Sequence, residues 1–353
     1  SIYYNSYWGY QDGKVRNSRV ATSLRPEILA LWQRRLSATT DLTLVANLFF
    51  ERRGTSALTW FDVTTPAPDN YKYMPSYYDD DDRIEVERSW TTNDLRYTQI
   101  DWDRLYLTNS IQQDGAARYA VSQRRTNHSN LSINVGFRST IGIATLHYGA
   151  ELKGVGNRQF RVMSDLLGAT HIRDIDYFIS DDVTYSHLTD NNLRNPDDII
   201  HEGDRYDYDY RTSRIGVKFY ATAEWSIADF DFIVGAQMTP ERIWRRGFFE
   251  KELFAGNASF GHSKSTTLTP AMINASCRYT LNIHILTTAL MLSSNSPDEE
   301  DIFLQPQYNN RLVDNIKLSN TLSAELSYTY ITKRLRLDAS LYLNSTTREM
   351  DVV

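Results

Sequence analysis

The sequence predicts an all-β fold, specifically an antiparallel transmembrane β-barrel, and three observations lead to this prediction. Apolar and polar residues alternate in long segments, aromatic residues are abundant, and the connections between segments are alternately short and long. Alternation places successive side chains on opposite faces of a sheet, as in a barrel wall with one lipid face and one lumen face. We therefore expect short periplasmic turns and long extracellular loops.

The composition fits strands and argues against disorder or membrane-spanning helices. The 353 residues include 23 Tyr, 14 Phe and 7 Trp but only 9 Pro and 16 Gly, which is typical of β-structure. No segment approaches the roughly 20 consecutive apolar residues of a transmembrane helix. The net charge of −6, with no basic cluster, argues against nucleic acid as a partner. The single cysteine, Cys277, excludes an intrachain disulfide.

Several segments alternate clearly, and most have about the 9 to 11 residues that cross a bilayer when tilted. In one of them Ile215, Val217 and Phe219 alternate with more polar residues. Charged side chains on the polar faces predict a hydrated lumen, which a packed soluble core would not tolerate. These predicted lumen residues are Lys218, Glu224, Arg336 and Asp338. The segments are 42–50, 131–137, 215–227, 322–330 and 335–343.

The lengths of the connections predict on which side of the membrane each one lies. The tight links are 37–41, 139–140, 228–229, 280–282 and 332–334. The long links, which we expect to be extracellular loops, are about 53–117, 155–210, 249–263 and 293–317. Two strands per tight link, plus flanking segments, give about 10 to 14 strands. Pattern alone leaves open a small complete barrel or a portion of a larger one.

Several loop and strand motifs resemble those of TonB-dependent outer-membrane receptors of the Bacteroidota type. They occur in the family's order and cover nearly the whole chain, most strongly before Tyr210. The motifs are 4–20 (YNSYWGYQDGKVRNSRV), 54–61 (GTSALTWF), 69–77 (DNYKYMPSY), 99–106 (QIDWDRLY), 165–168 (DLLG), 174–178 (DIDYF), 192–196 (NLRNP) and 202–210 (EGDRYDYDY).

This resemblance implies a 22-stranded barrel plugged by an N-terminal domain of the same polypeptide, with import powered by the TonB complex. No plug and no closing C-terminal strands are recognisable in residues 1–353, so we expect the central part of the barrel domain. The lipid bilayer of the bacterial outer membrane, a nutrient ligand and possible assembly with a surface lipoprotein complete the expected surroundings, and no cofactor is expected.

Aromatic residues of the first long loop are candidates for ligand contact, because tyrosine and tryptophan combine a large rigid surface with one polar group. The alternative is that they pack within the loop or against a lipoprotein. The candidates are Trp60, Tyr71, Tyr73, Tyr77 and Tyr78.

A charged cluster follows at Asp101, Trp102, Asp103 and Arg104, and we interpret it as a latch toward the plug or the lumen. Buried charges need partners, so Asp103 with Arg104, or either one with plug residues, is expected to form an ion pair. The tyrosines of the segment 204–210 are interpreted in a similar way, as a strand rim at the membrane interface.

Neither a metal site nor an active site is predicted. The run from Asp79 to Asp82 offers carboxylates to calcium, but the spacing of a calcium-binding loop is missing, which favours a solvated loop tip. The seven histidines show no paired metal-ligand spacing, and no nucleophile elbow or phosphate-binding loop occurs. We therefore expect a receptor that is not an enzyme and that takes up a glycan, peptide, iron chelate or cobalamin. A passive outer-membrane channel and a soluble β-sandwich adhesin or lectin are the alternatives.

Overall fold

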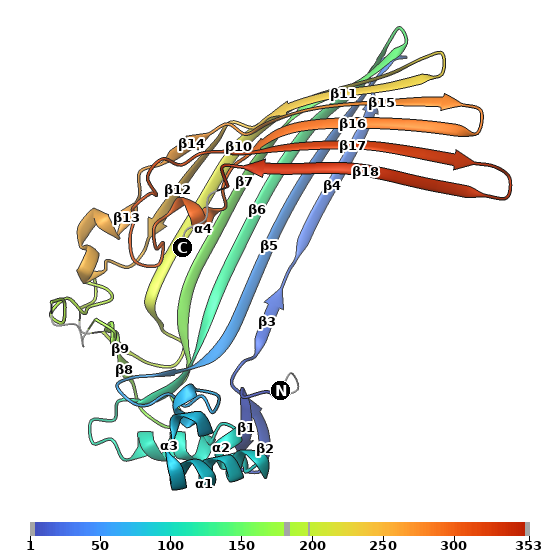
Figure 1. Cartoon of the computed structure of the whole chain (residues 1–353). Coiled ribbons are helices and arrows are strands. Elements are labelled where there is room, and N and C mark those ends of the chain that lie inside the picture. Colours follow the sequence, from blue (N-terminus) through green and yellow to red (C-terminus); the bar gives the residue numbers. More distant parts are fainter. Residues whose placement is uncertain (1–3, 180–183, 197, 350–353) are drawn as a thin grey trace.

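The computed structural model describes residues 4–179, 184–196 and 198–349 and consists of a large curved sheet with a smaller folded region at one end (Figure 1). Within these residues the sheet has 14 strands, and all neighbouring strands are antiparallel. The longer strands are β4 (Glu27–Arg35), β5 (Thr40–Trp60), β6 (Tyr119–Ile141), β7 (Ala144–Asp165), β10 (Arg205–Ile227), β11 (Phe230–Met238), β15 (Ala271–Leu281), β16 (His284–Asn295), β17 (Ser319–Ile331) and β18 (Arg336–Thr347). The shorter ones are β3 (Ala21–Leu24), β12 (Glu241–Gly247), β13 (Gly261–His262) and β14 (Thr266–Leu268). Two separate pairs are formed by β1 (Trp8–Gln11) with β2 (Lys14–Asn17) and by β8 (Ile172–Arg173) with β9 (Ile199–Ile200).

Three prolines interrupt strands that would otherwise be continuous. Pro26 separates β3 from β4, Pro240 separates β11 from β12, and Pro270 separates β14 from β15. Proline has no amide hydrogen to donate to the ladder, but the carbonyl of Pro26 still accepts from the amide of Phe50 at 3.1 Å. With each interrupted strand counted once, the 14 strands occupy ten positions in the wall, which agrees with the five predicted hairpins.

The two faces of the sheet differ in polarity along most of the long strands; β4 is an exception, because Leu29 and Leu31 lie on the polar face. Strand pairing places Ile215 beside Gly154, Leu131 and Leu48 on one face. Apolar side chains on this face are largely open, with Leu341 74% exposed, so the face needs an apolar solvent such as lipid. On the opposite face lie the predicted lumen residues, and they form ion pairs there. The pairs are Lys218 with Glu151 at 2.5 Å, Glu224 with His147 at 3.0 Å, and Arg336 with Asp338 at 2.8 Å.

A band of aromatic rings borders the apolar face at the end of the sheet where the short turns lie. From this band, at Trp225, the apolar face continues along β10 to Ile215, a rise of roughly 25 Å for a tilted strand. This is the height and the border expected of a membrane-facing surface. The stacked pairs of the band are Phe137 with Tyr148, Trp225 with Phe232, Phe230 with Tyr279, and His284 with Tyr328, with ring centroids 4.6–6.0 Å apart.

The turns and loops differ from the predicted bounds in two respects. The β6–β7 turn lies at Gly142 and Ile143, not at 139–140; Gly142 and Asn282 have the positive φ values, 61° and 53°, that two-residue hairpins require. The first two loops also begin later than predicted, because β5 continues to Trp60 and β7 to Asp165, while β10 already starts at Arg205. Above the apolar face these strands carry polar residues on both sides, so their hydropathy alternation disappears although their pairing continues.

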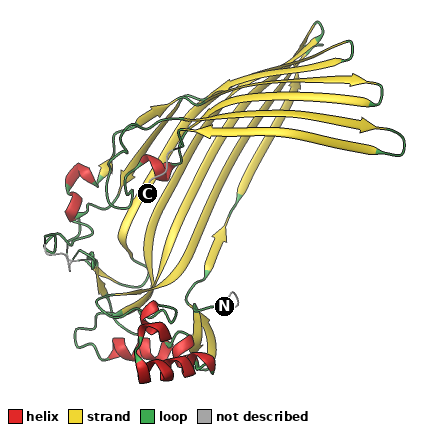
Figure 2. Cartoon of the chain, viewed as in Figure 1, coloured by secondary structure: helices red, strands yellow, loops and turns green. Residues whose placement is uncertain are grey.

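At the end opposite the short turns, residues 61–118 and the β1–β2 hairpin form a folded region that we call the loop cap (Figure 2). Asp94 accepts from the amide of Arg96 and Asp101 from that of Arg104, which caps the starts of two helices. Among the described residues no helix has the length and apolar character needed to cross a membrane. The cap contains η1 (Tyr71–Tyr73), η2 (Pro75–Tyr77), α1 (Asp80–Thr91), α2 (Leu95–Thr98) and α3 (Trp102–Ser110), while η3 (Glu252–Phe254), η4 (Gly256–Ala258) and α4 (Glu299–Ile302) lie in other loops.

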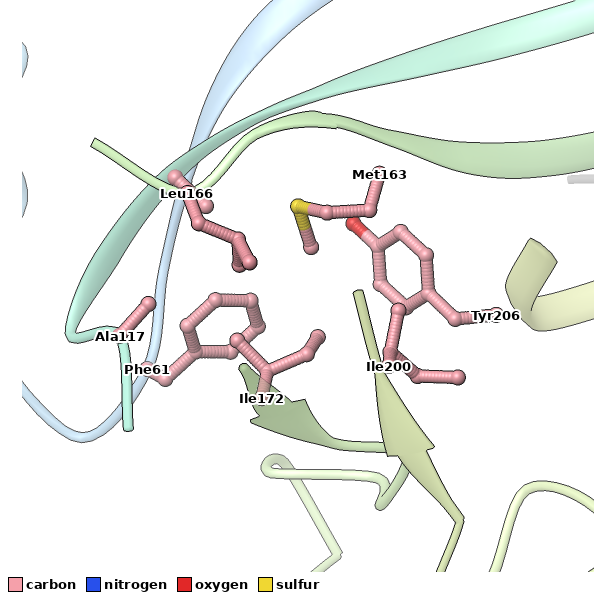
Figure 3. Packing of buried hydrophobic residues seen from close by; sticks show 8 residues of the cluster. Phe61, Ala117, Met163, Leu166, Ile172, Ile200 and Tyr206 are labelled. Atoms are coloured by element: carbon pink, nitrogen blue, oxygen red, sulfur yellow. The ribbon is translucent and has the colours of Figure 1, made fainter. Parts of the chain in front are cut away.

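A hydrophobic core joins the loops to the ends of the long strands (Figure 3). Phe61 follows β5, Met163 belongs to β7, and Ile172 and Ile200 come from the two strands of the small β8–β9 sheet. All four side chains are at most 5% exposed. The loops therefore pack against the strand ends through a shared hydrophobic core.

Candidate ligand site in the loop cap

The loop cap is anchored to the barrel strands through Trp102. This side chain is 0% exposed and packs with Ile100, Leu105 and Leu167. Its indole nitrogen donates to the carbonyl of Arg16 at 3.3 Å, and the Arg16 guanidinium lies 4.1 Å from the ring centroid. Arg16 then pairs with Asp165 at the end of β7 at 2.5 Å. Trp102 is thus a structural anchor within this chain, and its part in a latch toward the plug or the lumen stays a prediction.

Asn109 is a second anchor, which the sequence analysis did not identify. Its side-chain nitrogen donates to the carbonyls of Tyr119, Leu166 and Leu167 at 2.8–3.1 Å. Its side-chain oxygen accepts from the amides of Arg118 and Tyr119 at 2.8 and 3.1 Å. One buried amide therefore fastens α3 to both β6 and the end of β7, a role that no local sequence motif announces.

A cavity of about 380 Å³ opens in the cap, within the size range of small-molecule sites. Tyr73 donates its hydroxyl proton to the carbonyl of Thr65 at 2.7 Å, and Tyr119 donates to Thr64 at 2.8 Å. These bonds fix two of the aromatic walls. The lining residues are Thr64, Thr65, Pro66, Pro68, Tyr73, Tyr78, Val86, Arg96, Tyr97, Gln99, Asp101, Arg104, Leu105 and Tyr119.

Two polar groups of the cavity have no partner in the described part of the chain. The Oε1 atom of Gln99 is buried there without a hydrogen bond. The guanidinium of Arg104 makes no ion pair or side-chain hydrogen bond with any described residue, whereas the other lining arginine, Arg96, pairs with Asp94 at 2.7 Å. The cavity thus offers one free cationic donor to a polar ligand, and the Gln99 side chain in its wall holds an unpaired acceptor that is covered in this conformation.

The predicted site residues fall into two groups. Tyr73, Tyr78, Asp101 and Arg104 line the cavity together. The other three aromatic candidates lie outside it: Trp60 ends β5, and Tyr71 and Tyr77 form an edge-to-face pair, with centroids 5.6 Å apart, on the exposed surface of η1 and η2.

The predicted ion pair between Asp103 and Arg104 is not formed. Asp101 instead accepts the backbone amide of Arg104 at 3.0 Å and thereby caps α3, while Asp103 is exposed in the first turn of that helix. Carboxylates at a helix N-terminus are favoured by the helix dipole, so this position needs no cationic side chain.

The acidic run and the tyrosines of residues 206–210 also differ from their predictions. Asp79 precedes α1 as its N-cap residue, so the run starts a helix and is not a loop tip. Among the described residues, no group of three or more His, Cys, Asp or Glu side chains is placed to hold a metal ion. Tyr206, Tyr208 and Tyr210 are at most 4% exposed, so they lie under the loops and not at a membrane interface.

A buried polar network connects other loops beside the cap. The amine of Lys251 donates to Asn191 at 2.6 Å and to the carbonyl of Asp207, and the amide of Asp207 donates to Asp174 at 2.8 Å. Burial raises the pKa of Asp174 to about 6, although the charge of Lys251 opposes this shift, and burial lowers the pKa of Lys251. The network therefore fixes three chain segments around charges that are shielded from water.

Comparisons with known proteins support the fold and leave the sequence family open. No protein-family model matches the chain, and no curated protein sequence matches it. Three solved structures are similar to 94% of the chain: a copper transporter, OprC (TM-score 0.53, 12% identity), the ferric citrate transporter FecA in its unliganded form (0.52, 9%), and the ferric-catecholate import receptor Fiu from K12 E. coli (0.53, 13%). The chain spans 40%, 36% and 42% of their lengths, respectively. These likenesses confirm the predicted fold class, an antiparallel outer-membrane β-barrel sheet.

Proposed function

We propose that this chain is the barrel part of a TonB-dependent transporter in the bacterial outer membrane, and that it takes up a nutrient ligand without changing it chemically. One observation carries the proposal. A sheet whose apolar face ends in an aromatic band continues, at its other end, into a folded cap that holds a polar, tyrosine-lined cavity. Uptake across a membrane needs both a wall in the lipid and a site that captures the ligand outside it.

Two further observations support this proposal. The ordered loop motifs resemble TonB-dependent receptors of the Bacteroidota type, and transporters and import receptors occur among the structures that share the fold. In such a transporter the lumen holds a plug domain, which the TonB complex moves. The polar face with its ion pairs, such as Lys218 with Glu151, is then the wall against which the plug lies.

The cavity chemistry favours a ligand that carries both hydrogen-bond donors and acceptors. Arg104 would bind a carboxylate, carbonyl or hydroxyl oxygen, and Gln99 would accept from an amide or hydroxyl. Glycans and peptides meet both requirements, whereas iron chelates and cobalamin would place only a peripheral group in 380 Å³. Tyr71 and Tyr77, exposed nearby, would form an outer contact surface, with or without a lipoprotein partner.

The test uses the full-length protein in cells that lack their own copy. Growth is followed on limiting glycans, peptides, ferric chelates or cobalamin, with and without a functional TonB complex. The proposal is supported if uptake of one of these ligand classes requires both the full-length protein and the TonB complex. Uptake that persists without TonB, together with steady ion conductance of the purified protein in a planar bilayer, would instead identify a passive channel.

The site is tested separately by ligand binding to purified protein. Arg104→Gln removes the free cation of the cavity and should weaken binding at least about tenfold. Arg83→Gln removes another exposed arginine, on α1, that does not line the cavity, and it should leave binding unchanged. Equal affinity of both variants would place the ligand elsewhere, even if uptake depends on TonB.

A further inference from the structure

The outward face of the sheet carries a row of arginines directly above its apolar part, on the side of the loops. In strand register, Arg52 of β5 stands beside Asn127 of β6, then Arg158 of β7, Arg211 of β10 and Arg246 of β12. Neighbouring strands are about 4.8 Å apart, so the row extends roughly 20 Å along the wall. We propose that this arginine row binds the phosphate groups of anionic lipid headgroups in the membrane leaflet on the loop side.

The face that carries the row is the lipid face. Along β10, the odd-numbered residues lead from the aromatic band at Trp225 through apolar side chains to Ile215, and then to Ser213 and Arg211. Along β5 the same face leads from Leu48 through Phe50 to Arg52. The charge therefore begins where the apolar surface ends, which is the depth at which lipid headgroups lie.

The arginines are positioned by contacts within the wall. Arg158 makes two bonds to the carboxylate of Asp209, at 2.8 and 2.7 Å, and Arg205 from the next row reaches the same carboxylate at 2.7 Å. Arg211 lies across Gly156, where an added Cβ atom would stand 2.0 Å from the Nη2 atom. One carboxylate serves two guanidiniums there, so the outward surface keeps a large excess of positive charge.

A groove beside the row combines apolar and cationic walls. It measures about 560 Å³, and its lining includes Leu24, Pro26 and Phe50 together with Arg52, Arg158 and Arg211. One carboxylate, that of Glu51, also lines it and is paired with Arg53 at 3.1 Å. A lipid that carries phosphate matches this lining, because its acyl chain can pack on the apolar residues and its phosphate oxygens can bind the arginines. Arginine suits this second role because its planar fork binds phosphate with two hydrogen bonds and remains charged. Cationic residues near a membrane surface attract anionic lipids additively.

The chain supplies a matched control because adjacent arginines point to opposite faces. Arg52 and Arg125 lie on the outward face, whereas Arg53 and Arg124 lie on the polar face of the same two strands. All four are exposed. Replacing either pair removes the same charge from the same strands at nearly the same height, so only the outward pair should affect a lipid.

The experiment is native mass spectrometry of the full-length protein in a neutral detergent. Diphosphoryl lipid A, monophosphoryl lipid A and inorganic phosphate are titrated separately, and all variants are first checked for the heat-dependent gel mobility of a folded barrel. We expect tight binding of the diphosphoryl form, weaker binding of the monophosphoryl form, and no displacement by millimolar inorganic phosphate. Arg52→Gln with Arg125→Gln should lose at least about tenfold in affinity, while Arg53→Gln with Arg124→Gln retains it. Lysine at positions 52 and 125 should restore only part of the binding, because it returns the charge without the planar fork.

Three results would overturn the inference: equal affinity for both lipids, which indicates acyl contact alone; displacement by inorganic phosphate, which indicates a small-anion site; or equal losses in both double variants. The inference rests on the proposed membrane insertion, but its readout needs no nutrient and no TonB. Failure of lipid binding with intact uptake would reject only the arginine row, whereas lipid binding without any uptake would reject only the transport proposal.

Discussion

Asp209 and Arg158 form a two-pronged ion pair between β10 and β7, with Nε–Oδ1 and Nη2–Oδ2 distances of 2.8 and 2.7 Å. The carboxylate is 2% exposed, while the guanidinium remains 31% exposed. Asp209→Asn keeps the shape but removes the charge that holds two arginines together. We expect a loss of about 1–3 kcal/mol in the free energy of unfolding, since a buried charged partner is lost but the arginines can regain water.

The measurement is the urea midpoint of tryptophan fluorescence in lipid vesicles. Asp338→Asn serves as the control, because its pair with Arg336 is half-exposed on both sides, and such pairs contribute little. A midpoint for Asp209→Asn equal to that of the control would mean that the Arg158 pair contributes no more than an exposed one.

Asn109→Ala should loosen the loop cap without unfolding the barrel. The substitution leaves three carbonyls and two amides without their side-chain partner at a position that is 2% exposed. We expect a cost of about 2–4 kcal/mol, confined to the cap. Hydrogen exchange should quicken in α3 and at the start of β6 but not in β16 or β17. Asp103→Ala, on the exposed side of the same helix, should change neither region.

The strands of the wall were predictable from the sequence only over the part that crosses the membrane. The lipid-crossing strands were predictable because a bilayer imposes alternation on every one of them, as in Ile215–Trp225 of β10. The strand portions above the membrane were not, because Arg52 and Arg53 look alike in sequence although they face opposite sides. Above the membrane the strands remain paired through backbone hydrogen bonds, but no contrast in hydropathy between the two faces marks them in the sequence.

In the loop cap, the sequence pointed to several site residues but not to the contacts that position them. The sequence assigned the cap's aromatic residues to ligand contact and its charged residues to a latch, as two separate groups. Two residues of each group line the same cavity: Tyr73 and Tyr78, and Asp101 and Arg104. The burial of Trp102 depends on Arg16, 86 residues away in the chain, and Asn109 binds Leu166 across 57 residues. Contacts of this range leave no local periodicity, so their partners became visible only in three dimensions.

Asp174 should make the stability of the loop network depend on pH. Its pKa is raised from 3.8 to about 6 in the folded protein, so the folded state holds the proton more tightly than the unfolded state does. The corresponding stabilisation is complete below pH 3.8 and is lost as the pH rises through 6, a change of about 2–3 kcal/mol. Asp174→Asn can still accept from the amide of Asp207 but cannot titrate, so its stability should not show this decline.

The readout is the hydrogen-exchange protection of the Asp207 amide, corrected for the intrinsic pH dependence of exchange. Protection in the wild type relative to Asp174→Asn should fall as the pH rises from 4 to 7. Parallel profiles in the two proteins would mean that the charge of Lys251 fully offsets the burial of Asp174 and that the pKa of Asp174 stays near its ordinary value.

Cys277 offers a direct test of which face meets lipid. It pairs in register with Phe232 on one side and Thr288 on the other, so it lies on the apolar face, whereas Ser276 beside it lies on the polar face. In lipid vesicles, an apolar maleimide should label Cys277 and a charged, water-soluble methanethiosulfonate should not. A Cys277→Ser protein that carries Ser276→Cys should show the reverse preference, because its thiol meets the hydrated side of the wall. Each substitution exchanges one atom, sulfur for oxygen or the reverse, so both proteins should fold alike, and heat-dependent gel mobility checks this. Labelling of Cys277 by the charged reagent in intact vesicles would contradict a lipid-facing surface and, with it, both the transport proposal and the arginine row.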